Sequence, residues 1–256
     1  MQRKFMKKWF AIIAIFFSSY LIFLIATAPL ALVTNAVTLP KNVEIHGASG
    51  SIWQGDIARV VVNNNIIERV KTDVSFWSLF SLSPTVQLTF GDSMLAGPEG
   101  KLTMELSSSE LSLSEVELYL SASDVAKQLP LPIPVVAQGN IELQLSSVQI
   151  SYGEKLSCTA AQGELTWLRA GVVALEQSIK LGKLSANLSC DKGNILAKVA
   201  PNNNLGLSFD GMLALPSQRA SGNGYLKPGA KFPAELKNAL SFLGRPDNQG
   251  RYPLRF

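Results

Sequence analysis

The sequence is poor in the residues from which metal sites and catalytic sites are built. Its 256 residues include one histidine, His46, and two cysteines, Cys158 and Cys190. A zinc site takes four ligands and would have to borrow carboxylates, and a histidine-based triad would depend on His46 alone, although Ser49 lies nearby. No Gly-x-Ser-x-Gly turn and no phosphate-binding glycine loop occurs. We therefore expect no enzyme, no metal and no cofactor, and keep an anchored hydrolase as a third alternative.

Charged residues are also scarce, and they form no basic surplus in the body of the chain. They make up 16% of the sequence, below the roughly 25% of an average soluble domain. The net charge of +4 comes from Arg3, Lys4, Lys7 and Lys8, since the other residues hold 19 basic and 19 acidic side chains. Nucleic acids are bound by a basic patch on the folded part of a protein, so we expect no nucleic-acid partner.

A long uncharged run follows these four cations and covers residues 9–33. A helix of about 20 apolar residues spans a bilayer, and cations before the helix hold that end in the cytoplasm. A cleaved signal peptide is the alternative, since Ala26-Thr27-Ala28 resembles a cleavage site, but Pro29 fits poorly after the cut. We expect a cytoplasmic basic tail over residues 1–8, a transmembrane signal-anchor over 9–33 and an exported domain over 34–256.

The two cysteines both lie in the exported part of the chain. Cys158 and Cys190 each follow a Leu-Ser pair, 32 residues apart, and no Cys-x-x-Cys spacing suggests redox chemistry. Because an oxidising compartment permits disulfides, we predict a Cys158–Cys190 bridge. On the chain-entropy model such a bridge stabilises the fold by roughly 3–4 kcal/mol. Two buried free thiols are the alternative.

Apolar and polar residues alternate through most of the exported part. Residues 101–106, 140–145 and 204–210 have the period of two that is typical of half-buried strands. The phase shifts by one residue at Ser114-Glu115 and again at Ser146-Ser147, as it does at a β-bulge, and bulges bend sheets. We expect a mainly β fold: one transmembrane helix and then a bent antiparallel sheet, either an open groove or sandwich-like, with one or two short helices.

The remaining elements follow from caps, prolines and aromatic residues. Ser123-Asp124 before an apolar stretch predicts a short helix over residues 123–129. Proline before and glycine after predict a second helix over residues 234–243, and alternation at the end predicts a strand from Tyr252 to Phe256. Trp53, Trp77 and Trp167 are expected to pack beneath the sheet. Lining a sugar- or lipid-binding groove is the alternative for these three side chains.

Several motifs, in order along the chain, resemble the protein N family of the bacterial type II secretion system. The segment Gly47-Ala48-Ser49-Gly50-Ser51-Ile52-Trp53-Gln54-Gly55 is similar to the family's G-[ST]-hydrophobic-W-x-G signature, and weaker matches follow in the middle and near the end. The residues that carry the resemblance are Gly50, Trp53, Gly55, Gly163, Trp167, Gly244 and Gly250. Each motif alone is weak, and their order along nearly the whole chain makes the resemblance specific.

This resemblance implies a non-catalytic accessory component of the machine that exports folded proteins across the outer membrane. Such a component is a single-pass protein of the bacterial inner membrane with the bulk of its chain in the periplasm. Its partners would be pseudopilins, inner-membrane platform proteins or the secretin. The exported domain also resembles the β-sheet grooves of AsmA-type proteins, which implies the alternative of a membrane-anchored lipid-binding groove.

Overall fold

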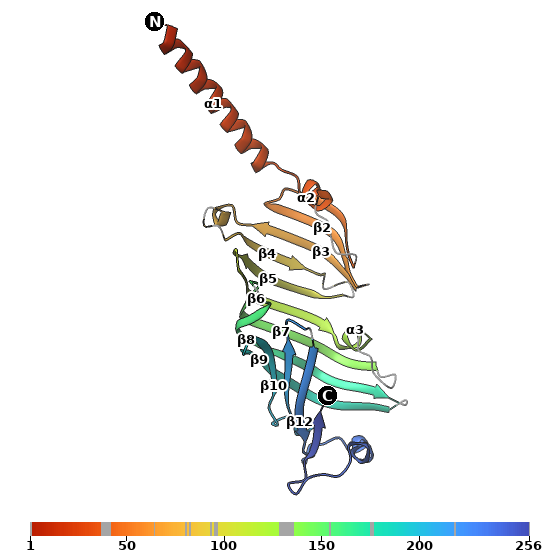
Figure 1. Ribbon diagram of the computed structural model, residues 1–256. Coiled ribbons are helices and arrows are strands. Elements are labelled where there is room, and N and C mark those ends of the chain that lie inside the picture. The colour runs from red at the N-terminus through yellow and green to blue at the C-terminus, as the bar shows by residue number, and fades with distance from the viewer. Residues whose placement is uncertain are drawn as a thin grey trace.

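The alternating segments form strands that join into one sheet. The computed structural model describes residues 2–36, 42–63, 65–79, 81, 83–92, 94, 97–127, 136–153, 155–174, 177–217 and 219–255. Among these residues thirteen strands form a single antiparallel sheet, in which each strand pairs with the strands before and after it in the chain (Figure 1). Strands β1 and β13 lie at its two edges. The sheet is therefore open, and the sandwich-like arrangement is wrong.

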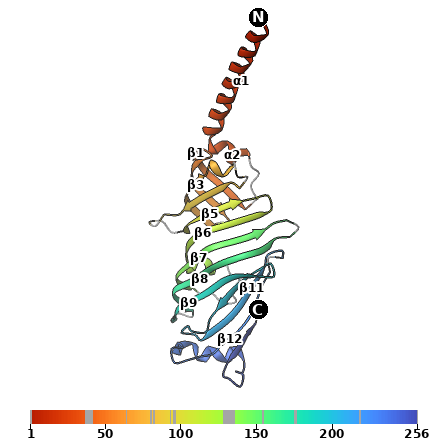
Figure 2. The same ribbon diagram turned by 90° about the vertical axis from the view of Figure 1, so that its left-hand side faces the viewer.

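The strands differ in length, and the longest lie in the middle of the sheet. The two ends of the sheet are narrower (Figure 2). The strands are β1 (Val43–Gly50), β2 (Gln54–Val62), β3 (Asn65–Val74), β4 (Thr85–Phe90), β5 (Glu99–Leu106), β6 (Glu110–Ser121), β7 (Val136–Ser151), β8 (Ser157–Ala174), β9 (Gln177–Asp191), β10 (Asn194–Val199), β11 (Leu207–Ala214), β12 (Arg219–Leu226) and β13 (Tyr252–Arg255). The expected terminal strand is confirmed as β13, and Phe256 lies outside the described residues.

The uncharged run at the start of the chain does not form one helix. Helix α1 (Gln2–Ala26) includes the four cations of the expected tail and ends before Pro29, and α2 (Leu30–Ala36) begins after it. Pro29 has no backbone N–H to continue the helical ladder, and it instead forms a bridge with Ser51. Figure 1 shows α1 projecting away from the sheet. No helix in the described part of the chain has both the length and the hydropathy of a membrane span.

Two bulges at the same level of the sheet confirm the predicted phase shifts. The register shifts between β5 and β6 from Lys101 to Thr103, and between β7 and β8 from Leu145 to Ser147. β6 and β7 keep a single register at this level, where one residue of each strand is left unpaired. Glu115, the skipped residue of β6, has a φ of 52°. Because both strands skip at one level, their apolar side chains stay on the same face before and after the bulge.

A second irregularity lies further along β7 and β8. The register shifts between Gln138 and Asn140, and the skipped Gly139 has a φ of 95°. A Cβ at this position would collide with the carbonyl oxygens of Leu168 and Arg169. Only glycine fits this positive φ and this close approach of two backbones.

The short helices agree only in part with the prediction. Helix α3 (Ala122–Lys127) confirms the first one, although its expected end lies outside the described residues. Residues 234–243 form two 3-10 helices, η2 (Ala234–Leu236) and η3 (Asn238–Leu243), and not the expected single helix. The Ser241 hydroxyl donates to the carbonyl of Asn238, three residues back, which favours the tighter turn. A further 3-10 helix, η1 (Trp77–Leu79), precedes β4.

Candidate functional site

One face of the sheet carries a continuous row of apolar residues, which we call the apolar row. It crosses the sheet from β4 to β13, and each member is the cross-strand partner of the next. The apolar row is Phe90, Gly100, Leu118, Leu143, Leu165, Ala186, Val199, Phe209, Gly224 and Leu254. Parallel rows add further aliphatic pairs, such as Leu113 with Val148 and Val116 with Leu145. This face therefore presents hydrocarbon across ten strands.

The opposite face carries an equally continuous row of polar residues, the polar row. Each of its members is the sequence neighbour of a member of the apolar row, and successive residues of a strand point to opposite faces. The polar row is Lys101, Glu117, Gln144, Glu164, Asn187, Lys198, Asp210, Asn223 and Arg255. Charges of both signs are interspersed along it, so this face suits water or a polar partner.

Hydrogen bonds and ion pairs order the side chains of the polar row. The Lys101 ammonium lies 3.0 Å from the Glu117 carboxylate, and this hydrogen bond together with the negative charge raises the pKa of Lys101. Hydrogen bonds from Ser185 and Thr166 lower the pKa of Glu164. The Thr166 hydroxyl donates to the Glu164 carboxylate over 3.1 Å. Because acidic and basic side chains are paired along it, the face is polar without being strongly acidic.

Within the described residues, no second layer of structure packs over the whole apolar row. The accessible surface is 17925 Å², whereas a compact monomer of this mass exposes about 11,000 Å². Part of the excess belongs to α1, but the members of the apolar row are themselves mostly half-buried, not buried. A small buried cluster of Ala170, Ile179 and Leu181, against which Leu205 and Leu236 pack, lies at one side of the sheet. The sheet is thus an amphipathic surface with its hydrocarbon partly open.

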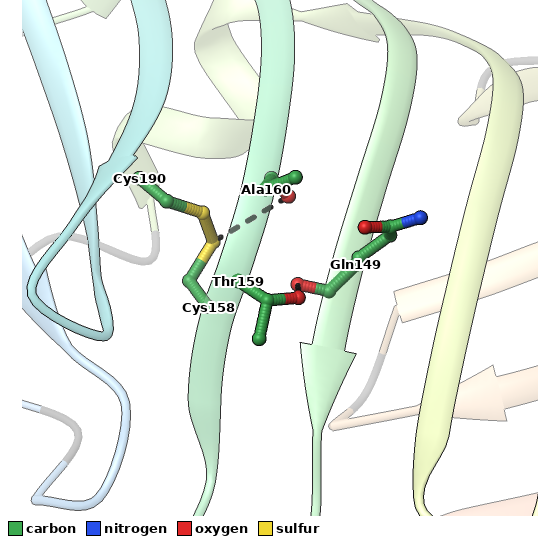
Figure 3. Close-up of a disulfide and its surroundings, with 5 residues drawn as sticks. All are labelled: Gln149, Cys158, Thr159, Ala160 and Cys190. Carbon is green, nitrogen blue, oxygen red and sulfur yellow. Dashed lines mark hydrogen bonds between the residues drawn. A yellow bond between two sulfur atoms is a disulfide. The ribbon is translucent and has the colours of Figure 1, made fainter.

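The predicted bridge between Cys158 and Cys190 is present in the structure. Cys158 lies at the start of β8 and Cys190 near the end of β9, with their Cα atoms 5.7 Å apart (Figure 3). The β8–β9 pairing ends at Gln162 and Ser189, so the disulfide closes the sheet beyond the last paired residues. The Cys158 N–H also donates to the carbonyl of Gly193 over 2.9 Å.

Neighbouring strands hold this end of β8 as well. The Thr159 hydroxyl donates to the carbonyl of Gln149 on β7 over 3.1 Å. Figure 3 also marks the 3.8 Å contact between the Cys158 sulfur and the Ala160 carbonyl oxygen. The disulfide therefore joins β8 to β9, and the Thr159 hydrogen bond ties the same end of β8 to β7.

The junction of α1 with the sheet is formed by the turn between β1 and β2. The indole N–H of Trp53 donates to the carbonyl of Ile25 over 3.0 Å, and the Ile52 N–H donates to the carbonyl of Ala28 over 2.9 Å. Gly55 lies against α2, where an added Cβ would come within 2.5 Å of the Leu30 side chain. The segment from Gly47 to Gly55 thus joins α1 and α2 to the β1–β2 hairpin.

An aromatic cluster lies at this junction. The rings of Trp53 and Phe76 pack edge to face with centroids 5.1 Å apart, and Phe76 packs likewise on Trp77 at 5.8 Å. Trp77 is 78% exposed, so the expectation that it packs beneath the sheet is wrong, because η1 turns its side chain outward. Trp167 does pack against the buried cluster of Ala170, and its indole N–H donates to the Gln138 carbonyl over 2.8 Å.

Titratable groups do not gather into a site in the part of the chain that the structure describes. No three histidine, cysteine, aspartate or glutamate side chains there could hold a metal ion together. His46 lies exposed on β1, and its Nε2 is 3.2 Å from the Glu44 carboxylate. Ser49 donates its hydroxyl to the carbonyl of Asp56 and does not bond to His46. Among the described residues, the features that stand out are surfaces: the apolar row, the polar row and the helix junction.

The comparison with known families decides the identity of the chain. The family model described as type II secretion system (T2SS), protein N, matches residues 41–255, which is most of the chain. The chain belongs to the type II secretion system protein N family.

Named relatives extend over nearly the whole sequence. The type II secretion system protein N of Aeromonas hydrophila is 30% identical over 254 residues, which cover 98% of each chain. The protein of the same name from Vibrio cholerae serotype O1 is 29% identical over 88% of each chain. The one from Klebsiella pneumoniae is 26% identical over 93% of this chain and 90% of its own. No solved structure matches this chain.

The residues that resemble the protein N family lie in three separate regions. Gly50, Trp53 and Gly55 meet at the helix junction, and a Cβ on Gly50 would come within 2.5 Å of the Gln54 carbonyl. Gly163 faces Leu145 beside the bulge of β7. The remaining residues are Trp167 on β8, Gly244 after η3 and Gly250 before β13. Gly50, Trp53 and Gly55 therefore lie close together at the helix junction, whereas the seven residues as a set do not.

Sequence reasoning missed two features of this site. The aromatic cluster joins the turn at Trp53 with the separate segment at Phe76, and no spacing rule connects them. Part of the two opposed rows could have been found, because strands such as β5, β7 and β11 alternate. Alternation does not predict the register between neighbouring strands. It is this register that places Leu143 beside both Leu118 and Leu165.

Proposed function

We propose that this protein is a non-catalytic accessory component of the type II secretion system, anchored in the bacterial inner membrane. The family membership supports its place in the secretion machine. The uncharged run over residues 9–33 and the exposed apolar side chains of α1, such as Ile15, Phe16 and Ile22, support the anchor. The four cations before the run favour a cytoplasmic N-terminus. The sheet then lies in the periplasm.

The observation that carries this proposal is the pairing of an exposed apolar helix with a long sheet that carries the continuous polar row on one face. A periplasmic surface of this kind offers contacts to other folded components without any reaction. We assign these contacts to the polar row, where a hollow of about 990 Å³ over β10–β13 is lined in part by Lys198, Asp210 and Arg255. Pseudopilins, inner-membrane platform proteins and the secretin are the candidate partners.

Photo-crosslinking in secreting cells tests this assignment. A photoreactive amino acid at Lys198 should give adducts with other secretion components. The same amino acid at Lys155, exposed in the connection between β7 and β8, is the matched control and should give few. Adducts at both positions alike, or at neither, would remove the polar row from the proposal.

A second candidate function, binding of lipid acyl chains, is favoured by the half-open apolar row. Apart from residues skipped at the bulges, the backbone groups of the inner strands pair with neighbouring strands, so the face offers an occupant mainly hydrocarbon contact. A peptide laid on it would leave its own N–H and C=O groups without partners, whereas an acyl chain has none to satisfy. The resemblance to AsmA-type grooves agrees with this candidate.

A lipid carrying a photoreactive group in its acyl chain tests the second candidate. The full chain is labelled in vesicles and the modified peptides are identified by mass spectrometry. Labels on Leu143 and Leu165, but not on their polar neighbours Gln144 and Glu164, support lipid on the apolar row. Labels confined to α1 would contradict it.

A further inference from the structure

The aromatic cluster at the helix junction is too exposed to be part of a core. Trp77 is 78% exposed and Phe76 is 45% exposed, although large aromatic side chains usually bury most of their surface. The cluster combines two segments, the turn at Trp53 and the connection that holds η1. Both segments lie at the end of the sheet where α1 ends, and the Val74 N–H donates to the Trp53 carbonyl over 2.7 Å. The cluster is therefore one rigid surface feature.

The two segments are also free of charge. No charged residue occurs between Asp73 and Asp92, and none between Glu44 and Asp56 apart from a titratable His46. The two segments that carry the rings are thus aromatic, apolar and hydroxyl-bearing, and Asp73 borders them. Tryptophan is enriched where a membrane meets water, because its ring is apolar and its N–H is polar.

The cluster cannot lie far from α1. The Trp53 indole is hydrogen-bonded to the carbonyl of Ile25 in the last turns of this helix, and Trp77 is linked to Trp53 through Phe76. Exposed apolar side chains continue from the helix to its last turn, where Leu24 and Ile25 are also exposed. A bilayer that contains α1 would therefore have its boundary close to these rings.

We propose that Trp53, Phe76 and Trp77 form a membrane seat, which inserts between the headgroups and the acyl chains of the bilayer from which α1 emerges. This inference rests on the anchoring of α1 proposed above. The seat holds the β1 end of the sheet against the membrane and fixes the direction in which the other strands extend. The competing explanations are that a partner protein, or a second copy of this chain, covers Trp77.

Site-directed labels measure the seat in the full chain. Cys158 and Cys190 are joined to each other, so one introduced cysteine can be labelled with an environment-sensitive fluorophore. The position tested is Trp77→Cys, in vesicles of phosphatidylethanolamine and phosphatidylglycerol. The matched control is Phe242→Cys, because Phe242 is 90% exposed. It belongs to η3, which lies against β13, and β13 is the edge of the sheet opposite β1. Lipids brominated on the acyl chain serve as the quencher.

The seat predicts a blue-shifted emission at position 77 and at least a twofold stronger quenching by brominated lipid than at position 242. A label at 77 as unquenched as the control would overturn it. A blue shift without quenching would also overturn it, since the label at position 77 would then be covered by protein and not by lipid. A label at Phe16→Cys in α1 tests the anchor separately: quenching there without quenching at 77 rejects the seat alone.

Discussion

The indole nitrogen of Trp53 lies 3.0 Å from the carbonyl oxygen of Ile25, and this bond joins the first turn of the sheet to the last turns of α1. The two residues are 28 positions apart. Around this bond, the Ile52 N–H reaches the Ala28 carbonyl and Pro29 bridges to Ser51. The helix and the segment that follows it are therefore attached to the β1–β2 turn at several points.

Replacing Trp53 by phenylalanine tests this attachment. Trp53→Phe keeps a ring against Phe76 but removes the N–H that donates to the carbonyl of Ile25. We expect a loss of about 1 kcal/mol at the junction, measured as an about fivefold faster hydrogen exchange of the Ile52 amide. Trp167→Phe, which removes an indole bond elsewhere, should leave that amide unchanged. Equal exchange in wild type and Trp53→Phe would show that the bond contributes nothing.

A methyl group at Gly55 should loosen the same junction by a different route. The added Cβ would come within 2.5 Å of the Leu30 side chain and 2.7 Å of the Thr72 hydroxyl, so α2 or β3 must shift. Overpacking of this kind costs about 1–3 kcal/mol, measured by thermal unfolding. Gly229→Ala is the control, because nothing lies within 4 Å of its Cβ position. Similar melting temperatures for the two variants would argue against close packing at Gly55.

The alternating sequence allowed much of the sheet to be predicted, and its limits are physical. The phase shift at Ser114-Glu115 predicts a bulge, and Glu115 adopts the φ of 52° that accommodates one. The outward direction of Trp77 could not be predicted, because it depends on the η1 turn, which has no clear signal in the sequence. Residues 234–243 carry helical spacing, but local side-chain bonding to Asn238 favours 3-10 turns there.

Loss of the disulfide should weaken the middle of the sheet without changing its topology. Cys158→Ser and Cys190→Ser are each expected to lower the free energy of unfolding by about 2–4 kcal/mol. The double variant should be no less stable than either single one, since both remove the same bond. Thiol titration of the denatured, unreduced wild type should find no free thiol. Two titrating thiols would contradict the bridge.

The loop before β13 should respond to acid through Asp247. The backbone N–H of Arg251 and its guanidinium both donate to the Asp247 carboxylate, at 2.9 and 2.8 Å, and these bonds lower the pKa of Asp247. Because the folded pKa is below that of the unfolded chain, the carboxylate stabilises the loop above the usual aspartate range. This contribution is lost as the pH falls through the folded pKa.

Carboxyl NMR titration measures this shift directly. The Asp247 resonance should titrate below the range of an unperturbed aspartate, about pH 3.9. In Arg251→Ala the Asp247 pKa should move up towards that range, since the guanidinium is gone while the backbone N–H remains. An unshifted Asp247 in the wild type would mean that the loop is open in solution.

Secretion itself tests the central claim most directly. In a strain that lacks this chain, the amount of type II substrate in the medium is compared before and after complementation with the wild-type gene. The proposed role predicts that substrate is retained in the periplasm of the deletion strain and released on complementation, while membrane lipid composition stays unchanged. Normal secretion in the deletion strain together with an altered lipid composition would contradict the role in secretion and favour the lipid-binding alternative.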